Sequence, residues 1–354
     1  MTMDADEAFA QIDAIFINHP TFARVRRMVR NIIELPHTKT APCAHVSGPS
    51  GVGKSTLREC IKAEHPPVKD GAEVELLGGL RMKTDRFKVL IVRMPSSPTV
   101  KALAREILKA YGDEFWNRGD EYTLGDRVDR YIAANGTRAI VIDEAQRAVE
   151  RSGTVVSDKL IDWIKSRHET NSVAFILLGL GSLRHLFQAD RQIRRRWDAE
   201  IRLEPYRWFR ADGSPDLEGQ DDFIALLATF RDLTPIPFDF DIESEEVAFR
   251  FFYLSRGLID GVKKVLLMCA RLMKDNGQTS IDLPLLKQAA EEAFPLEEEG
   301  MQNPFSEDFV AIAPPPIEDD YQVRIAKSRS KKSAGKGALS KKRLNQVVIS
   351  HLVK

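Results

Sequence analysis

The chain contains the run Gly48-Pro49-Ser50-Gly51-Val52-Gly53-Lys54-Ser55, which fits the pattern G-x-x-x-x-G-K-[ST] at every fixed position. A short apolar run, Ala44-His45-Val46, precedes it, and a helical pattern from Leu57 to Ala63 follows. In a strand–loop–helix context, the glycines let backbone N–H groups approach a phosphate without interference from a Cβ atom. The N-terminus of the helix adds its dipole and its free N–H donors. The run therefore predicts a phosphate-binding loop.

The predicted ligand is a nucleotide with a magnesium ion. Lys54 would supply a positive charge to the β- and γ-phosphates, and the Ser55 hydroxyl would be a magnesium ligand. ATP and Mg²⁺ are the expected cofactors. The residues expected to surround the phosphates are Gly48, Pro49, Ser50, Gly51, Val52, Gly53, Lys54, Ser55 and Thr56.

A second part of this site is predicted about 90 residues downstream. The run Ile140-Val141-Ile142-Asp143-Glu144 is a buried-strand pattern that ends in two carboxylates. Asp143 would hold magnesium through water, and Glu144 would polarise the attacking water. A kinase needs an acceptor site rather than a water-activating glutamate, so the pair favours ATP hydrolysis.

Further apolar runs alternate with amphipathic segments on both sides of these carboxylates. Lys88–Val92, Ala139–Ile142 and Val173–Leu178 read as strands buried on both faces. The segments Val100–Tyr111 and Leu124–Ala134 read as the helices between them. This alternation predicts an α/β protein with a parallel sheet flanked by helices.

The chain is expected to have four parts. Asn18-His19-Pro20 separates two helical patterns in an entry segment, residues 1–40. Residues 41–208 form the predicted nucleotide-binding core, residues 209–294 read as helices only and form a lid subdomain, and residues 295–354 form an extended basic tail. The helices expected in the lid are Phe223–Arg231, Ser244–Ser255, Leu258–Lys274 and Leu283–Ala293.

Composition narrows the class of protein. Of the 354 residues, 43% are hydrophobic and 29% are charged, which is typical of a folded globular chain. No apolar run approaches the ~20 residues needed to cross a bilayer, and the acidic start does not resemble a secretion signal. Three scattered cysteines, Cys43, Cys60 and Cys269, make no ligand pattern. We expect a cytoplasmic protein without a membrane partner.

Charge is unevenly distributed along the chain. Residues Tyr321–Lys354 contain ten Lys/Arg and no Asp/Glu, so residues 1–320 carry 52 − 10 = 42 basic and 52 acidic side chains. Such an arm suggests binding to nucleic acid or to an acidic partner, and a solvated terminus without a role is the alternative. Apolar side chains at its end could be buried against a protein partner; these are Leu344, Val347, Val348, Ile349, Leu352 and Val353.

Two further polar features could belong to the site. Ser182 follows the Val173–Leu178 strand, where it could sense a γ-phosphate or a water, or could simply cap a loop. Arg196, in the run Arg194-Arg195-Arg196-Trp197, could reach the γ-phosphate of a neighbouring subunit. A solvated basic face or a DNA contact is the alternative for this run.

The chain resembles the TniB/TnsC group of AAA+ ATPases, the regulator subunits of multi-component DNA transposition systems. The resemblance extends from about Asn18 to Ala293. The most particular motifs are the Met-Pro-Ser-x-Pro run and the Asp-x-Gln-hydrophobic-x-x-Arg-aromatic box. The motifs that carry the resemblance are Asn18-His19-Pro20, the phosphate loop, Val92–Thr99, Val141–Glu144, Leu178–Ser182, Asp190–Trp197 and Ser255–Asp260.

The resemblance implies roles for single residues. Ser182 falls at the sensor-1 position and Arg196 at the arginine finger. Several relatives have an arginine in the sensor-2 region, where this chain has Asp260-Gly261, and Lys264 is the candidate there. The candidates for DNA contacts are Lys101, Arg147 and Arg151.

Proteins of this group bind ATP and assemble as rings or helical filaments on double-stranded DNA. They recruit a DDE-type transposase and link it to a TniQ-like target selector. The resemblance thus implies an ATP-dependent homo-oligomeric regulator of transposition. The open alternatives are a scaffold with structural ATP and an AAA+ motor or loader in another process.

Overall fold

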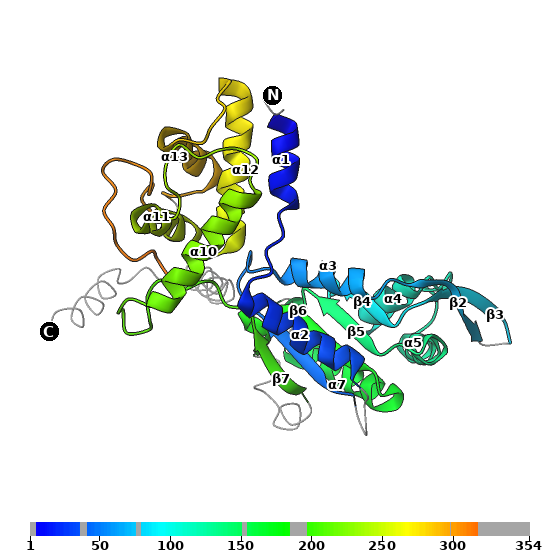
Figure 1. The fold of residues 1–354 in the computed structure, drawn as a ribbon. Helices are drawn as coiled ribbons and strands as arrows, with labels where there is room; N and C mark the ends of the chain where they lie inside the picture. The colour runs from blue at the N-terminus through cyan, green and yellow to red at the C-terminus, as the bar shows by residue number, and fades with distance from the viewer. Residues whose placement is uncertain are drawn as a thin grey trace, which may run out of the picture. The chain divides into compact units, whose positions relative to one another are not determined.

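The computed structural model describes residues 5–35, 41–75, 79–150, 154–184, 197–297 and 299–317. Its centre is a sheet of five strands in the order β4-β5-β6-β1-β7, and every neighbouring pair is parallel (Figure 1). The strands are β1 (Cys43–Ser47), β4 (Val89–Arg93), β5 (Ala139–Asp143), β6 (Ala174–Gly179) and β7 (Trp197–Arg202). The predicted α/β class with a parallel sheet is confirmed.

Helices cover both faces of this sheet because its inner strands are apolar on both sides. Along β5, Ile140 and Ile142 join the core that includes α4 and α5, whereas Ala139 and Val141 join the core that includes α2 and α3. This alternation follows from the period of two in a strand. The helices concerned are α2 (Pro20–Glu34), α3 (Lys54–Glu64), α4 (Val100–Tyr111), α5 (Glu121–Asn135) and α7 (Thr154–Asn171).

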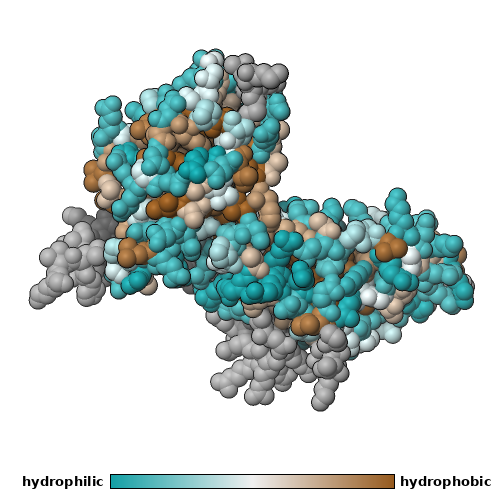
Figure 2. Space-filling model, in the orientation of Figure 1, coloured by the Kyte–Doolittle hydropathy of each residue, from teal (hydrophilic) through white to brown (hydrophobic). Residues whose placement is uncertain are grey.

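The sequence of α2 explains how this helix begins and which of its faces packs on the sheet. His19 caps the helix by accepting a hydrogen bond from the Phe22 N–H, and Pro20 is at its first position, where no donor is needed. Phe22, Val25 and Val29 face inward and are buried. Over α2, Figure 2 shows hydrophilic side chains on the outward face. The helix therefore covers the sheet with one stripe only.

Two features of the core were missing from the sequence prediction. One is the antiparallel hairpin of β2 (Val68–Glu75) and β3 (Arg81–Arg86), which forms a separate two-stranded sheet. The other is β7, an edge strand that pairs only with β1. Both are rich in charged residues, because each buries at most one face, and they lack the continuous apolar pattern of the inner strands.

The two helices of the entry segment pack on different parts of the chain. α1 (Ala5–Ala14) lies along α12 (Ile259–Asn276), and its Ala8 and Ile12 belong to the apolar core of the helical lid (Figure 1). Lys274 pairs with Asp6 at 2.7 Å, and the guanidinium of Arg271 lies over the Phe9 ring. α2, by contrast, packs on the sheet.

The remaining helices form the lid around one apolar core. An aromatic cluster, in which Trp208, Phe223 and Phe252 contact one another, lies at its centre. Leu296 and Phe305 are also buried in this core, so packed structure continues past residue 294, where the sequence placed the start of a tail. The lid helices are α10 (Leu217–Leu233), α11 (Glu245–Ser255), α12 and α13 (Leu283–Ala293), and the core has the short α6 (Arg147–Glu150) and η1 (Gly181–Leu183).

The chain divides into two compact units, residues Met1–Ile317 and residues Glu318–Lys354. The second unit, which contains the predicted basic arm, lies outside the described residues. Within the described residues, no helix combines the length and apolar character needed to span a bilayer.

A buried ion pair holds the segment that follows α4. Asp113 is fully buried and accepts hydrogen bonds from the Nε and Nη2 atoms of Arg127, whose guanidinium also donates to the carbonyls of Phe115 and Arg118. Asp113→Ala should lower the free energy of unfolding by about 3–5 kcal/mol, because it leaves a buried charge without its partner. Denaturant unfolding measures this change.

The matched control is Asp126→Ala, which breaks an exposed Asp–Arg pair with Arg130 on the same helix, α5. Its expected cost is below about 1 kcal/mol, because solvent screens the pair. Equal losses in the two variants would contradict the structural role of Asp113.

Candidate nucleotide site

The phosphate loop connects β1 to α3 in a conformation that needs its glycines. Gly51 and Gly53 have φ values of 77° and 104°, in the left-handed region that favours glycine. At Gly48, a Cβ atom would lie 2.4 Å from the Leu203 carbonyl oxygen. Gly53 is the N-cap of α3 and has no side chain to bond the first-turn N–H groups, so these donors face the loop.

Lys54 points into this loop. Its Nζ atom donates to the carbonyl oxygens of Gly48 and Pro49, at 2.7 and 2.6 Å. Ser55 and Thr56, the next two residues of α3, are exposed beside it. The predicted charge and hydroxyl are therefore at the same end of one helix.

A cavity of about 370 Å³ lies at the loop and is lined by both apolar and polar residues. The apolar lining includes Ile15, Phe16, Ile17 and Phe22, which lie in and after the connection between α1 and α2. The polar lining includes the loop together with Lys54, Ser55, Thr56, Asp143, Glu144 and Gln146. Apolar surface for a base and polar groups for phosphates fit a nucleotide.

The two carboxylates predicted at the end of β5 meet the loop in this cavity. Asp143 is buried, and its Oδ1 accepts from the Glu144 N–H at 2.8 Å. Its Oδ2 accepts from Nη1 of Arg58, a residue of α3, at 2.6 Å. Carboxylate and hydroxyl oxygens are the ligands that Mg²⁺ prefers, so Asp143 and Ser55 fit this ion.

Glu144 has a backbone φ of 56°, in the left-handed region that is uncommon for non-glycine residues. Three groups surround its carboxylate. Nη2 of Arg147 lies 3.3 Å away, Nη2 of Arg93 lies 3.8 Å away, and Nε2 of Gln146 donates to Oε2 at 3.2 Å.

Gln146 is a site residue that the sequence analysis missed. Its side chain is buried, donates to Glu144 and accepts from the Leu180 N–H at 3.3 Å. At Gly179, a Cβ atom would lie 2.5 Å from its Oε1. Gln146 thus connects Glu144 to the end of β6. The only sequence signal was its position two residues after Glu144.

On the lid side, the structure separates two neighbouring lysines. Lys263 lines the cavity, donates to the Asp13 carbonyl oxygen and lies 3.4 Å from Asp13 Oδ1. Lys264, the sensor-2 candidate, instead has its ammonium 4.5 Å from the centre of the Phe294 ring and does not line the cavity. Asp260, at the start of α12, also lines the cavity.

The other predicted residues are spread over the core. Ser182 is fully buried in η1, where its hydroxyl bonds to Glu150 at 3.3 Å, and it does not line the cavity. Lys101 is partly buried in the first turn of α4. Arg147 donates to the Met94 carbonyl oxygen in addition to its pairing with Glu144. Arg151 and Arg196 lie outside the described residues.

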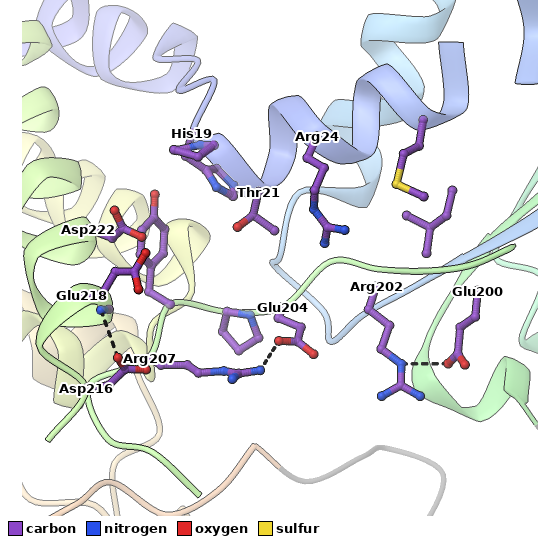
Figure 3. Close-up of a pocket in the computed structure, with 16 residues that line it drawn as sticks. His19, Thr21, Arg24, Glu200, Arg202, Glu204, Arg207, Asp216, Glu218 and Asp222 are labelled. Atoms are coloured by element: carbon purple, nitrogen blue, oxygen red, sulfur yellow. Dashed lines mark hydrogen bonds and ion pairs between the residues drawn. The ribbon is translucent and has the colours of Figure 1, made fainter. Parts of the chain in front are cut away.

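A second cavity, of about 460 Å³, lies between α2, the end of β7 and the start of α10 (Figure 3). Its charged walls pair internally: Arg202 donates to Glu200 at 2.8 Å, and Arg207 pairs with Glu204. His19 lines both cavities. Burial lowers the pKa of His19, and the negative charge of Asp222 opposes this effect.

The fold and the loop define a P-loop protein of the AAA+ ATPase class. The sequence matches the family described as Bacterial TniB protein over residues 9–207, which is 199 of 354 residues. The chain therefore belongs to the TniB family. No similar sequence was found among curated proteins.

Several solved structures are similar to this chain in fold. The Cdc6p protein of Pyrobaculum aerophilum has a TM-score of 0.54 at 12% identity, with 92% of this chain and 89% of that chain covered. The ORC1 protein of Aeropyrum pernix in complex with DNA has a TM-score of 0.53 at 14% identity, with 79% of this chain and 66% of that chain covered. The ORC2 protein of the same organism, in ADPNP–ADP complexes, has a TM-score of 0.51 at 13% identity, with 82% of this chain and 74% of that chain covered. These likenesses concern the fold.

Proposed function

We propose that the protein is an ATP-dependent regulator of DNA transposition. It assembles as a ring or filament on double-stranded DNA, recruits a DDE-type transposase and links it to a TniQ-like target selector. ATP hydrolysis controls this assembly. The observation that carries the proposal is the cavity in which the phosphate loop of a TniB-family chain faces Asp143 and Glu144.

The residues of the cavity suggest how the nucleotide is held. Its base would lie against Ile15–Ile17 and Phe22, with the phosphates in the loop. Lys54 would exchange its carbonyl partners for phosphate oxygens, which accept stronger, charge-assisted hydrogen bonds. Ser55 and Asp143 would hold Mg²⁺, which neutralises charge on the phosphates.

Glu144 is the proposed general base. A carboxylate that lines the cavity together with the loop can accept the proton of an attacking water. Arg93, Arg147 and Gln146 surround this carboxylate and fix its direction. Arg196 remains the candidate for a charge supplied by a neighbouring subunit.

DNA binding is proposed from the family and is in line with one neighbour in fold, the ORC1 protein described in complex with DNA. Contacts with phosphates would give affinity that is independent of sequence and sensitive to salt. Lys101 is a candidate for such a contact within the described residues. The pairing of Arg147 with Glu144 makes its guanidinium a weaker candidate.

The deciding experiment measures duplex DNA binding with ATP, a non-hydrolysable analogue, ADP and no nucleotide, followed by imaging of the complexes. We expect rings or filaments with ATP or the analogue and dissociation with ADP. Nucleotide binding without DNA binding in any state would contradict the transposition role. It would favour a motor or loader that acts on protein partners.

Gln146→Ala should lower kcat for ATP hydrolysis by about ten- to a hundredfold, because the general base would lose the group that orients it. The dissociation constant for ATP should remain unchanged. Gly179→Ala should also lower kcat, because its Cβ atom would lie 2.5 Å from Gln146 Oε1 and 2.8 Å from Leu183 Cδ1. Steady-state kinetics and nucleotide titrations measure both quantities.

The matched control is Gln288→Ala, which removes an exposed glutamine that bonds to Glu292 on α13. This variant should hydrolyse ATP at the wild-type rate. If Gln146→Ala also kept the wild-type kcat, Gln146 would have no role in positioning Glu144.

A further inference from the structure

Arg58 connects the helix of the phosphate loop to the carboxylate expected to face magnesium. It lies four residues after Lys54 on α3, so both side chains are on the same face of this helix. Its Nη1 donates to Asp143 Oδ2 at 2.6 Å, and its Nη2 and Nε donate to Glu59 Oε1 at 2.8 and 3.0 Å. The guanidinium therefore bridges one buried and one exposed carboxylate.

The two oxygens of Asp143 are in different situations. Oδ1 is already bonded to the Glu144 N–H, a contact that fixes the carboxylate at the end of β5. Oδ2 is therefore the oxygen through which Asp143 can interact with a magnesium ion and its water shell. In this structure, the guanidinium of Arg58 occupies that oxygen.

A guanidinium and a divalent cation repel each other when they share one carboxylate oxygen, and the repulsion is larger where the carboxylate is buried. The side chain of Asp143 is 9% exposed, so solvent weakens this repulsion little. Arg58 has a second acceptor, Glu59, whose side chain is 55% exposed. The guanidinium can thus leave Asp143 and keep its bonds to Glu59.

We propose that Arg58 is a positioning residue that competes with Mg²⁺ for Asp143 and so sets the magnesium concentration required for nucleotide binding. This inference rests on the proposed nucleotide site. Without magnesium, Arg58 holds the carboxylate in place. With a nucleotide and Mg²⁺ in the site, the guanidinium would release Asp143 and keep its bonds to Glu59. The site would then bind nucleotide more weakly without Mg²⁺ than with it.

The test is equilibrium binding of a fluorescent ATP analogue to the full chain at a series of Mg²⁺ concentrations and in EDTA. Arg58→Ala should lower the Mg²⁺ concentration for half-maximal binding about three- to tenfold, because one charge-assisted hydrogen bond no longer has to break. Glu59→Gln should raise this concentration, because it weakens the alternative position of the guanidinium.

Arg26→Ala is the matched control. Arg26 forms an ion pair with Glu64 at the same distance, 2.6 Å, and with similar exposure, but Glu64, unlike Asp143, does not line the cavity. This variant should keep the wild-type magnesium requirement. Thermal unfolding verifies that each variant is folded.

Two results would overturn the proposal. One is an unchanged or higher magnesium requirement in Arg58→Ala. The other is an equal loss of affinity with magnesium and in EDTA, which would make Arg58 a simple positive charge near the phosphates. Failure of the wild-type chain to bind nucleotide in any condition would instead refute the proposed site itself.

Discussion

Replacement of Glu144 by glutamine is expected to slow ATP hydrolysis by about a hundred- to ten-thousandfold, the usual contribution of a general base. Glutamine keeps the shape of the side chain but cannot accept the proton of the attacking water. The nucleotide cradle is unchanged, so ATP should bind as in the wild type. Assemblies on DNA should then last longer, because ATP remains intact. Phosphate release and the lifetime of the DNA complexes measure these effects.

Glu73→Gln on β2 is the control for the loss of one carboxylate, and it should hydrolyse ATP normally, because Glu73 does not line the cavity. If Glu144→Gln turned over ATP at the wild-type rate, another group would have to be the base. In that case, the unusual backbone of Glu144 would need a different explanation.

Lys54→Ala should abolish detectable ATP binding and, with it, ATP-dependent assembly on DNA. Lys54 is the only residue of the loop with a positive charge, and its ammonium already lies among the loop carbonyls. Its removal leaves the loop itself with only backbone dipoles to oppose the phosphate charge. Isothermal titration with ATP and a DNA-binding assay measure the two losses.

Lys62→Ala is the matched control for Lys54→Ala, since Lys62 is an exposed lysine two turns further along the same helix. It should bind ATP as the wild type does. Assembly of Lys54→Ala on DNA to the wild-type extent would show that nucleotide does not govern assembly. That outcome would favour a scaffold.

Sequence alone predicted the parts of the fold that depend on local pattern. The inner strands are continuous apolar runs, and helix α4 begins at Val100 and ends at Tyr111, the bounds that periodicity gave. The phosphate loop has fixed spacing because backbone geometry demands glycine at certain positions. The edge strand β7 does not need a continuous apolar sequence, because water reaches one side of it and polar residues are tolerated there.

The parts of the site that sequence missed depend on contacts between distant segments. Arg58 meets Asp143, and Gln146 meets Leu180, only after the sheet has assembled. Lys263 and Lys264 are adjacent residues of the same type, so the sequence does not distinguish them. Which one lines the cavity depends on which face of α12 is turned toward it. No periodicity or spacing encodes these choices, so they could not be predicted from one sequence.

The placement of α1 gives the lid a second covalent tether to the core. One tether is the segment from Leu203 to Trp208, between β7 and the lid, and the other is Ile15–His19, between α1 and α2. Two connections restrict the movement of the lid relative to the core more than one connection would. Because Ile15–Ile17 also line the cavity, a base bound where we propose would touch one of these connections. Nucleotide exchange should therefore affect the lid through this connection.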